Sequence, residues 1–241
     1  VDMAFTPHNI VFLPDHKHMV VGDCHGGNLM LFDMTNASQG KLKSLGKRVF
    51  PGHNVRGLQI SADGQMLIVA HQMLNELAHT VRNDVHWGLL MSNDLRWLKV
   101  ESVLKGGDDL YTGAHMHPLG EAGNATGDPS QVAVAKDGMV VVTLGGVGEI
   151  AYGKEDDFSL QRLQVGLRPM DLKIDDARGL VYVANMFGDS VSIVDLEAQT
   201  VKEIPLGKQA ELSEADKGEL LFFNAKLSHD GWMSCNSCHT E

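Results

Sequence analysis

The residues with the clearest chemical pattern lie near the end of the chain, at Cys235, Cys238 and His239. Two cysteines separated by two residues, with a histidine directly after the second, are typical of a covalent haem attachment site. One turn of backbone presents both thiols to the two vinyl groups of one porphyrin, and the next residue can ligate the iron. The pattern therefore predicts haem c bound through thioethers at both cysteines, with His239 as an axial ligand of the haem iron.

Two other kinds of site share this spacing. The same pair of cysteines is half of a zinc site, but zinc needs further ligands and the remaining cysteine, Cys24, lies far upstream. A thioredoxin-type dithiol also has this spacing and needs a strand that leads into a helix. Spacing alone leaves both alternatives open. We expect Cys24 to be a buried, unreactive residue of a strand.

The residues before the motif extend the pattern. The stretch 218–239 resembles the first haem segment of the bacterial di-haem cytochrome c peroxidases, which include the MauG-like enzymes and read G-x-x-L-F-x-x-x-x-L-S-x-D-G-x-x-S-C-x-x-C-H. The resemblance covers roughly the final tenth of the chain. The residues on the pattern are Gly218, Leu221, Phe222, Leu227, Ser228, Asp230, Gly231, Ser234, Cys235, Cys238 and His239.

This resemblance implies an oxidoreductase. In such enzymes one haem receives electrons and another reacts with peroxide or oxidises a substrate. The sequence holds one C-x-x-C-H, so we expect the second haem outside it and the chain to be a fragment. The implied partner is a redox protein or the remaining part of the same polypeptide. The sequence also leaves calcium binding open, although no acidic set of ligands stands out.

Haem is attached through thioethers outside the bacterial cytoplasm, so the resemblance implies a periplasmic or otherwise extracytoplasmic protein. Two other functions stay open. One is a non-catalytic electron-transfer cytochrome or a binding propeller. The other is a propeller hydrolase of the lactonase type, in which the haem motif would be incidental.

The composition favours an all-β protein and excludes some partners. The chain has 241 residues, 43% of them hydrophobic, with 26 glycines and 6% aromatic residues. This balance is typical of short strands joined by tight turns. The formal charge of −11 argues against nucleic acid and anionic membrane surfaces, because both would repel the chain. No apolar run approaches the roughly 20 residues that span a bilayer.

Internal repeats predict the fold. Four segments share a pattern of short apolar strands joined by turns, two of which contain Asp-Gly pairs, and their first strands align at Ile10, Leu58, Val132 and Leu172. The spacings are 48, 74 and 40 residues, and a propeller blade repeats every 40–50 residues or so. The long interval therefore predicts one blade plus an insertion. We place the insertion at 105–126, with a smaller excursion at 75–84.

The last repeat, with the sequence Tyr-Val-Ala-Asn at 182–185, resembles a YVTN-type β-propeller blade. That family usually closes with seven blades, so the resemblance implies four visible blades of a larger ring. We expect blades over 1–207 and the N-terminal segment of a c-type cytochrome, peroxidase-like domain over 208–241. A helix should begin after Ser213 as N-cap, with Asp216 three positions later, and place Leu221 and Phe222 on an apolar face.

Several other residues are candidates for a site or for packing. The stretch His115, Met116 and His117 offers copper or haem ligands, or it is a solvated loop. Another group stands just before the first strand of each blade and could form a polar funnel, dock the haem segment or bond to neighbouring blades. These residues are His8, Arg56, Asp128 and Arg168. We also expect Trp87 and Trp97 to pack between blades.

Overall fold

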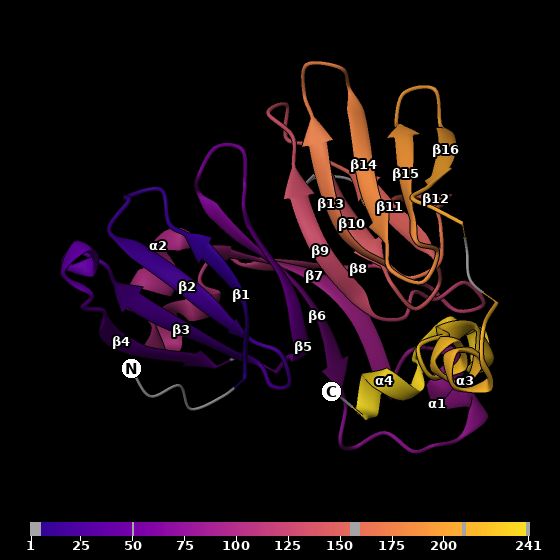
Figure 1. Cartoon of the computed structure of the whole chain (residues 1–241). Coiled ribbons are helices and arrows are strands. Elements are labelled where there is room, and N and C mark those ends of the chain that lie inside the picture. Colours follow the sequence, from indigo (N-terminus) through magenta and orange to yellow (C-terminus); the bar gives the residue numbers. More distant parts are fainter. Residues whose placement is uncertain (1–5, 50, 155–159, 209–210, 240–241) are drawn as a thin grey trace.

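The computed structural model describes residues 6–49, 51–154, 160–208 and 211–239. Four antiparallel sheets of four strands follow one another along the chain, and a helical segment comes after them (Figure 1). We call these sheets blades 1 to 4 in chain order. Their arrangement is that of β-propeller blades, and the expected all-β fold is confirmed.

Within each blade the strands pair in chain order. The strands of blades 1 and 2 are β1 (Pro7–Phe12), β2 (His18–Asp23), β3 (Asn28–Asp33), β4 (Lys43–Val49), β5 (His53–Ile60), β6 (Met66–Leu74), β7 (Met91–Lys99) and β8 (His115–Pro118). Those of blades 3 and 4 are β9 (Pro129–Val134), β10 (Val140–Leu144), β11 (Glu149–Gly153), β12 (Gln161–Gln164), β13 (Pro169–Asp175), β14 (Leu180–Asn185), β15 (Ser190–Asp195) and β16 (Thr200–Pro205). The α-helices are α1 (Arg82–His86), α2 (Val100–Lys105), α3 (Glu214–Phe222) and α4 (Cys235–Cys238).

Apolar side chains fill the spaces between successive blades. The first strands β1, β5, β9 and β13 contact one another in order, as the innermost strands of a propeller do. Three buried clusters lie between blades 1 and 2, blades 2 and 3, and blades 3 and 4. In that order they include Leu31 and Leu67, Ile68 and Val142, and Ile150 and Val183. Each blade therefore depends on its neighbour for burial of its apolar face.

Blade 2 differs from the expected repeat. Part of the expected insertion at 105–126 is β8, the fourth strand of this blade, so that placement is wrong there. The extra residues lie between β6 and β7, which confirms the expected excursion at 75–84 and contains α1, and between β7 and β8, where α2 forms. The strand was hard to recognise because His115, Met116 and His117 interrupt the usual run of aliphatic residues.

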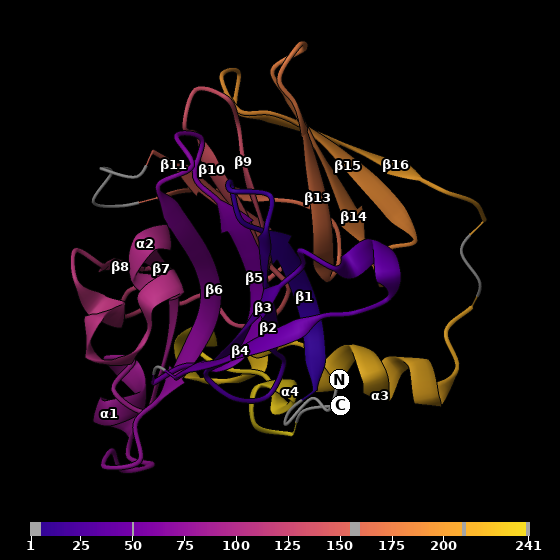
Figure 2. The same ribbon diagram turned by 90° about the vertical axis from the view of Figure 1, so that its left-hand side faces the viewer.

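The C-terminal helical segment, residues 211–239, lies against one end of the blades. In both ribbon views α1, α3 and α4 are at the same lower end of the sheets (Figure 1 and Figure 2). Helix α3 begins after Ser213, as expected. The Ser213 side chain accepts a hydrogen bond from the backbone amide of Asp216, which completes a capping box. Within the described residues, no helix is long and apolar enough to cross a membrane.

Four packing predictions have mixed outcomes. Trp97 is buried between blades 2 and 3, as expected, but Trp87 is 60% exposed and does not pack between blades. Leu221 is 54% exposed, so the expected apolar face is open to solvent at this residue. The residue that buries its ring is Phe223, against which Phe222 packs edge-on.

Candidate functional site

Helix α4 has one reactive face and one buried face. Cys235, Cys238 and His239 are exposed, whereas Asn236 and Ser237 between the cysteines are 1% and 0% exposed. Residues three apart lie on the same side of a helix. Both thiols therefore face outward together, while the residues between them pack on the propeller.

Asp128, which directly precedes β9, anchors this helix. Its Oδ1 accepts a hydrogen bond of 2.6 Å from Ser237 Oγ, and its Oδ2 accepts one from Ser234 Oγ. All three side chains are buried. A buried carboxylate is costly unless it is hydrogen-bonded, and hydrogen bonds to a charged acceptor are stronger than neutral ones. Asp128 thus fixes the short turn that carries the two thiols.

Blade 2 adds a second set of polar contacts to the same turn. The carbonyl oxygen of Ser237 accepts a 3.0 Å hydrogen bond from Asn54 Nδ2 and lies 2.8 Å from His53 Nε2. The Asn54 amide also donates to Gln72 Oε1 at 2.6 Å, and Gln72 Nε2 donates to Asn93 Oδ1 at 2.8 Å. Because Asn54, Gln72 and Asn93 are buried, this chain of hydrogen bonds restricts the position of α4.

Blade 4 holds the preceding helix α3 through a cation–π contact. Arg168, directly before β13, places its guanidinium carbon 3.1 Å from the centroid of the Phe223 ring and 5.0 Å from that of Phe187. Arg168 is buried. A cation over an aromatic face is worth more when solvent is excluded, so this contact stabilises the junction between α3 and the propeller.

Asn54, Asp128 and Arg168 hold the same position in their blades, four residues before the apolar residue that aligns the repeats. All three have a positive φ, of 50°, 55° and 51°. Such a conformation is uncommon outside glycine and persists where surrounding structure enforces it. The expectation that Arg56 and His8 hold this position is wrong, because Arg56 lies two residues later and His8 is exposed. Of the expected roles, docking of the C-terminal segment fits the contacts of Asp128 and Arg168.

Two glycines let the C-terminal segment approach the backbone of blade 3. A Cβ on Gly127 would lie 2.3 Å from Cβ of Ala225, and one on Gly146 would lie 2.8 Å from it. The Ala225 amide donates to the Gly146 carbonyl oxygen at 2.8 Å. Ala225 is fully buried as a result. Larger residues at either glycine would therefore separate the segment from the blade.

The cysteines are chemically available. Cys235 and Cys238 are free thiols, and Cys24 is buried as expected, directly after β2. Burial raises the pKa of the Cys238 thiol, and the negative charges of Asp128 and Cys235 raise that pKa further. Cys238 is therefore protonated at neutral pH.

The zinc and dithiol alternatives gain no support from the geometry. Among the residues that the structure describes, Cys235, Cys238 and His239 belong to no group of three converging metal ligands. The turn before α4 is a 3₁₀ segment and not the strand that a thioredoxin motif needs. Two free, outward-facing thiols with an exposed histidine directly after them are the donor set that haem c requires. The residues present fit that group.

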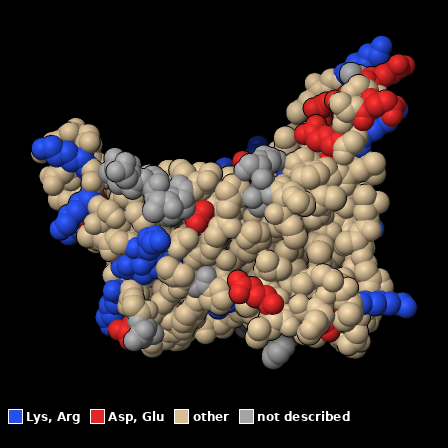
Figure 3. Space-filling view, turned by 90° about the horizontal axis from the view of Figure 1, so that it is seen from below, with Lys and Arg blue, Asp and Glu red and all other residues tan. Residues whose placement is uncertain are grey.

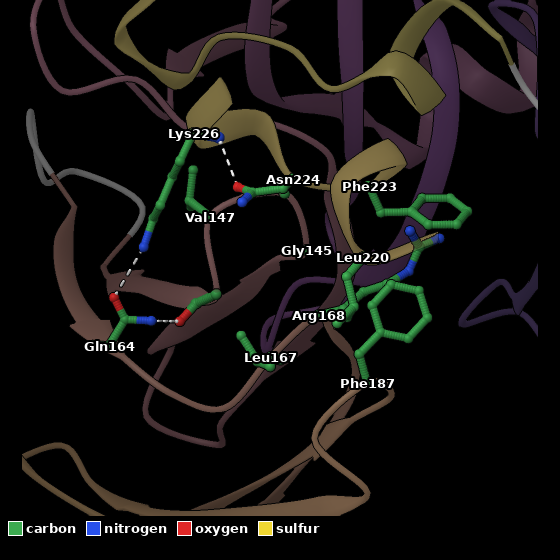
Figure 4. A pocket seen from close by; sticks show the side chains of 12 residues that line it. Gly145, Val147, Gln164, Leu167, Arg168, Phe187, Leu220, Phe223, Asn224 and Lys226 are labelled. Atoms are coloured by element: carbon green, nitrogen blue, oxygen red, sulfur yellow. Dashed lines mark hydrogen bonds between the residues drawn. The ribbon is translucent and has the colours of Figure 1, made fainter. Parts of the chain in front are cut away.

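A cavity of about 250 Å³ lies between blades 3 and 4 and the end of α3 (Figure 4). Its wall includes Arg168, Phe187, Phe223 and Lys226, and Lys226 Nζ donates to Gln164 Oε1 at 3.4 Å. It includes none of the haem motif residues. The volume is below the range of typical ligand pockets, roughly 300–1,000 Å³. We therefore interpret it as a crevice of the docking interface.

The two histidines of β8 pack on a tryptophan. The His115 ring stacks on Trp97 with centroids 5.0 Å apart, and the His117 ring lies 4.8 Å from Trp97. Burial and the neighbouring His117 lower the pKa of His115. Met116 Sδ accepts a hydrogen bond from Arg96 at 3.2 Å. These residues form part of a strand, so the solvated-loop interpretation is wrong, and no third ligand among the described residues joins them.

The end of the molecule seen from below has few charges near its middle. Lys, Arg, Asp and Glu gather mostly toward the edges, and other residues form most of the surface (Figure 3). Several large apolar side chains are exposed in the excursion between β6 and β7 and in the C-terminal segment. They are Leu77, Trp87, Leu89, Leu221 and Leu227.

No family model matches the chain, and no curated protein matches its sequence. Solved structures match it in fold. Hydrazine synthase from Kuenenia stuttgartiensis has a TM-score of 0.62 and 18% identity over 77% of this chain and 57% of its own. The dihydro-haem d1 dehydrogenase NirN in complex with DHE has a TM-score of 0.58 and 19% identity over 86% of this chain and 38% of its own.

A protein from Lactobacillus plantarum gives a TM-score of 0.58 and 18% identity over 82% of this chain and 54% of its own. At such low identity these similarities show the fold alone, which is the β-propeller. The chain spans about half the length of these structures, or less.

Proposed function

We propose that this chain is the propeller and haem attachment segment of a haem c oxidoreductase, with the propeller as the platform that holds the segment in place. The observation that carries the proposal is the division of α4. Cys235 and Cys238 face outward as free thiols, while Ser237 is bound by Asp128 and Asn54 on the inner side.

Each residue of the site has a distinct role in this proposal. Cys235 and Cys238 would hold the porphyrin through thioethers, and His239 would ligate the iron. When bound, haem c supplies a reversible one-electron centre. Asp128 and Asn54 keep the attachment turn at a fixed position on the propeller.

The finer proposal is a di-haem peroxidase of the MauG-like type, with the second haem in a further part of the polypeptide. Several residues on the family pattern fix this local fold here. Ser228 Oγ donates to the Ala225 carbonyl oxygen at 2.8 Å, and Gly231 has a φ of 87°. Leu221 and Leu227 are exposed apolar positions of the same pattern, as expected of side chains that contact haem or the remaining haem domain.

The similarity in fold to NirN supports a haem-related role, because the name of that protein states that its substrate is a dihydro-haem d1. Thioether formation requires maturation outside the bacterial cytoplasm, so the proposed location is extracytoplasmic. The proposed electron donor is a soluble redox protein.

The test uses the parent polypeptide, produced with a bacterial haem c maturation system and supplied with hydrogen peroxide and a reduced redox dye. We expect peroxide-dependent oxidation of the dye that Cys235→Ala with Cys238→Ala abolishes. Covalent haem without peroxide turnover would identify an electron carrier and contradict the peroxidase proposal. Lactone hydrolysis that persists in the double variant would contradict a haem function.

A further inference from the structure

Two histidines and one aspartate converge where α1 meets the C-terminal segment. Ligand atoms of His86, His229 and Asp230 all lie within 4.8 Å of one another. His86 Nδ1 is 2.6 Å from Asp230 Oδ2, and His229 Nδ1 is 3.7 Å from Asp230 Oδ1. The two imidazole centroids are 5.6 Å apart. Residues separated by more than a hundred positions in sequence thus face one small volume.

The backbone on both sides of this cluster is fixed by other contacts. The Trp232 indole donates to the His86 carbonyl oxygen at 3.1 Å, and Asn93 Nδ2 donates to the Trp232 carbonyl oxygen at 2.9 Å. A Cβ on Gly88 would lie 2.7 Å from the Trp232 ring, so the ring fits only because that residue is glycine. The Ala125 amide donates to the Asp230 carbonyl oxygen at 3.0 Å. The cluster therefore lies on a rigid frame.

We propose that His86, His229 and Asp230 bind one divalent transition metal ion of the zinc type, which joins the α1 excursion of blade 2 to the segment before the haem motif. Two imidazoles and one carboxylate form a common zinc ligand set, with ligand distances of about 2.0–2.2 Å. Calcium prefers an all-oxygen set, which this cluster does not offer. Nothing in the proposal depends on haem.

The gap between His229 and the Asp230 carboxylate, which also accepts a backbone hydrogen bond from Gly123, favours this assignment over a simple hydrogen-bonded cluster. One carboxylate oxygen is paired with His86 at 2.6 Å, whereas the 3.7 Å between the other oxygen and His229 is too long for a hydrogen bond. A cation between these groups would bind all three. Tetrahedral ligands lie closer together than 4.8 Å, so small side-chain rotations are needed.

Solvent access and charge are suitable for such an ion. The side chains of His86, His229 and Asp230 are 36%, 37% and 14% exposed. An ion can therefore enter from solution, and water can occupy the fourth position. The formal charge of −11 on the chain favours a cation.

The experiment uses the full chain with Cys235→Ala and Cys238→Ala, because free thiols with His239 would bind zinc by themselves. Co²⁺ is added as the probe and its visible absorption is recorded, followed by competition with Zn²⁺. We expect one equivalent of Co²⁺ with the strong absorption of a four-coordinate ion and no thiolate charge-transfer band. Zn²⁺ should displace it and raise the melting temperature.

The key variant is His229→Ala, which removes an exposed ligand. It should weaken binding at least about tenfold, since even outer-shell changes cost 10–100-fold. The matched control is His79→Ala, because the His79 side chain is 83% exposed and lies outside the cluster. Circular dichroism checks that both variants fold. Absence of stoichiometric binding, or equal affinity in the His229 and His79 variants, would overturn the proposal.

Discussion

The inner and outer faces of the C-terminal segment differ in chemistry. On the inner face Ser234 and Ser237 are buried and hydrogen-bonded to Asp128, whereas on the outer face the thiols of Cys235 and Cys238 are exposed. In a typical surface helix the polar residues face solvent. The reversal here shows that polar contacts anchor the segment and leave the two thiols facing solvent.

The anchors come from equivalent positions in three blades. Asn54, at the start of β5, and Asp128 and Arg168, directly before β9 and β13, all take a left-handed backbone conformation, and all three contact the segment. Residues on the outer face make no comparable hydrogen bonds through their side chains among those described. The inner face should therefore govern stability, and the outer face should govern cofactor binding.

Removal of the central anchor should have the largest effect on stability. Asp128→Gly leaves the Ser234 and Ser237 hydroxyls without their acceptor, and glycine tolerates the φ of 55° at this position. We expect a loss of about 2–4 kcal/mol in unfolding free energy. Hydrogen exchange should increase over residues 228–239. Glu197→Ala, on an exposed turn, is the control, and equal losses in both variants would refute the role of Asp128.

A decrease in pH should weaken the hydrogen bonds by which blade 2 holds α4. His71 is fully buried next to Gln72, and burial lowers the pKa of His71 to about 4. The unfolded chain, with an ordinary pKa of 6.5, binds more protons in this window, so unfolding free energy must fall as pH decreases from 6.5 to 4. We expect His71→Gln to remove up to about 3 kcal/mol of this dependence.

Urea denaturation of both proteins at several pH values measures this effect. Asp94 acts in the opposite direction, because burial raises the pKa of its carboxyl to about 6, but it is present in both proteins. Arg96 also lies close and lowers the pKa of His71. A constant difference in unfolding free energy between the two proteins from pH 7 to 4 would contradict the prediction.

The cation–π contact between Arg168 and Phe223 should contribute less to the unfolding free energy than Asp128 does. Phe223→Leu keeps an apolar side chain but removes the ring on which Arg168 lies. We expect a loss of about 1–2 kcal/mol, measured by chemical denaturation. Phe222→Leu is the matched control, because Phe222 is half-buried and does not contact Arg168 in this way. A larger loss in the Phe222 variant would be evidence against the contact.

The outer face should contribute least to stability. In the protein without haem, Cys235→Ala with Cys238→Ala removes two exposed side chains, so unfolding free energy should change by less than about 0.5 kcal/mol. Cys24→Ala, at a buried position, should cost more, on the order of 1 kcal/mol. Thermal denaturation compares the variants. Greater destabilisation by the double variant would show that the thiols are part of the anchor.

Much of the fold could be predicted from local sequence. The Asp-Gly pairs at 63–64 and 137–138 form turns with positive φ at Gly64 and Gly138, and apolar runs between such turns form the strands. Strand β8 was missed because its histidines contribute to packing on Trp97 instead of an aliphatic pattern. Local patterns carry no information about such an aromatic contact.

The haem motif is a local pattern, and Asp128 was among the candidates for docking the haem segment, but the residues that Asp128 binds could not be predicted. The spacing of Cys235 and Cys238 is local, but Asp128 reaches Ser234 and Ser237 across more than a hundred residues. The one available signal was position, since Asn54 occupies in blade 2 the place that Asp128 occupies in blade 3. The assignment of the haem attachment residues and the domain boundary near residue 208 both stay predictions.

The most direct measurement is the mass of the tryptic peptide that contains Cys235 and Cys238. The chain is produced in cells with a bacterial haem c maturation system, and a known c-type cytochrome is matured in the same cells as a positive control. The account predicts one haem on this peptide, attached at both cysteines. Unmodified thiols in a colourless chain, alongside a fully matured control, would contradict it.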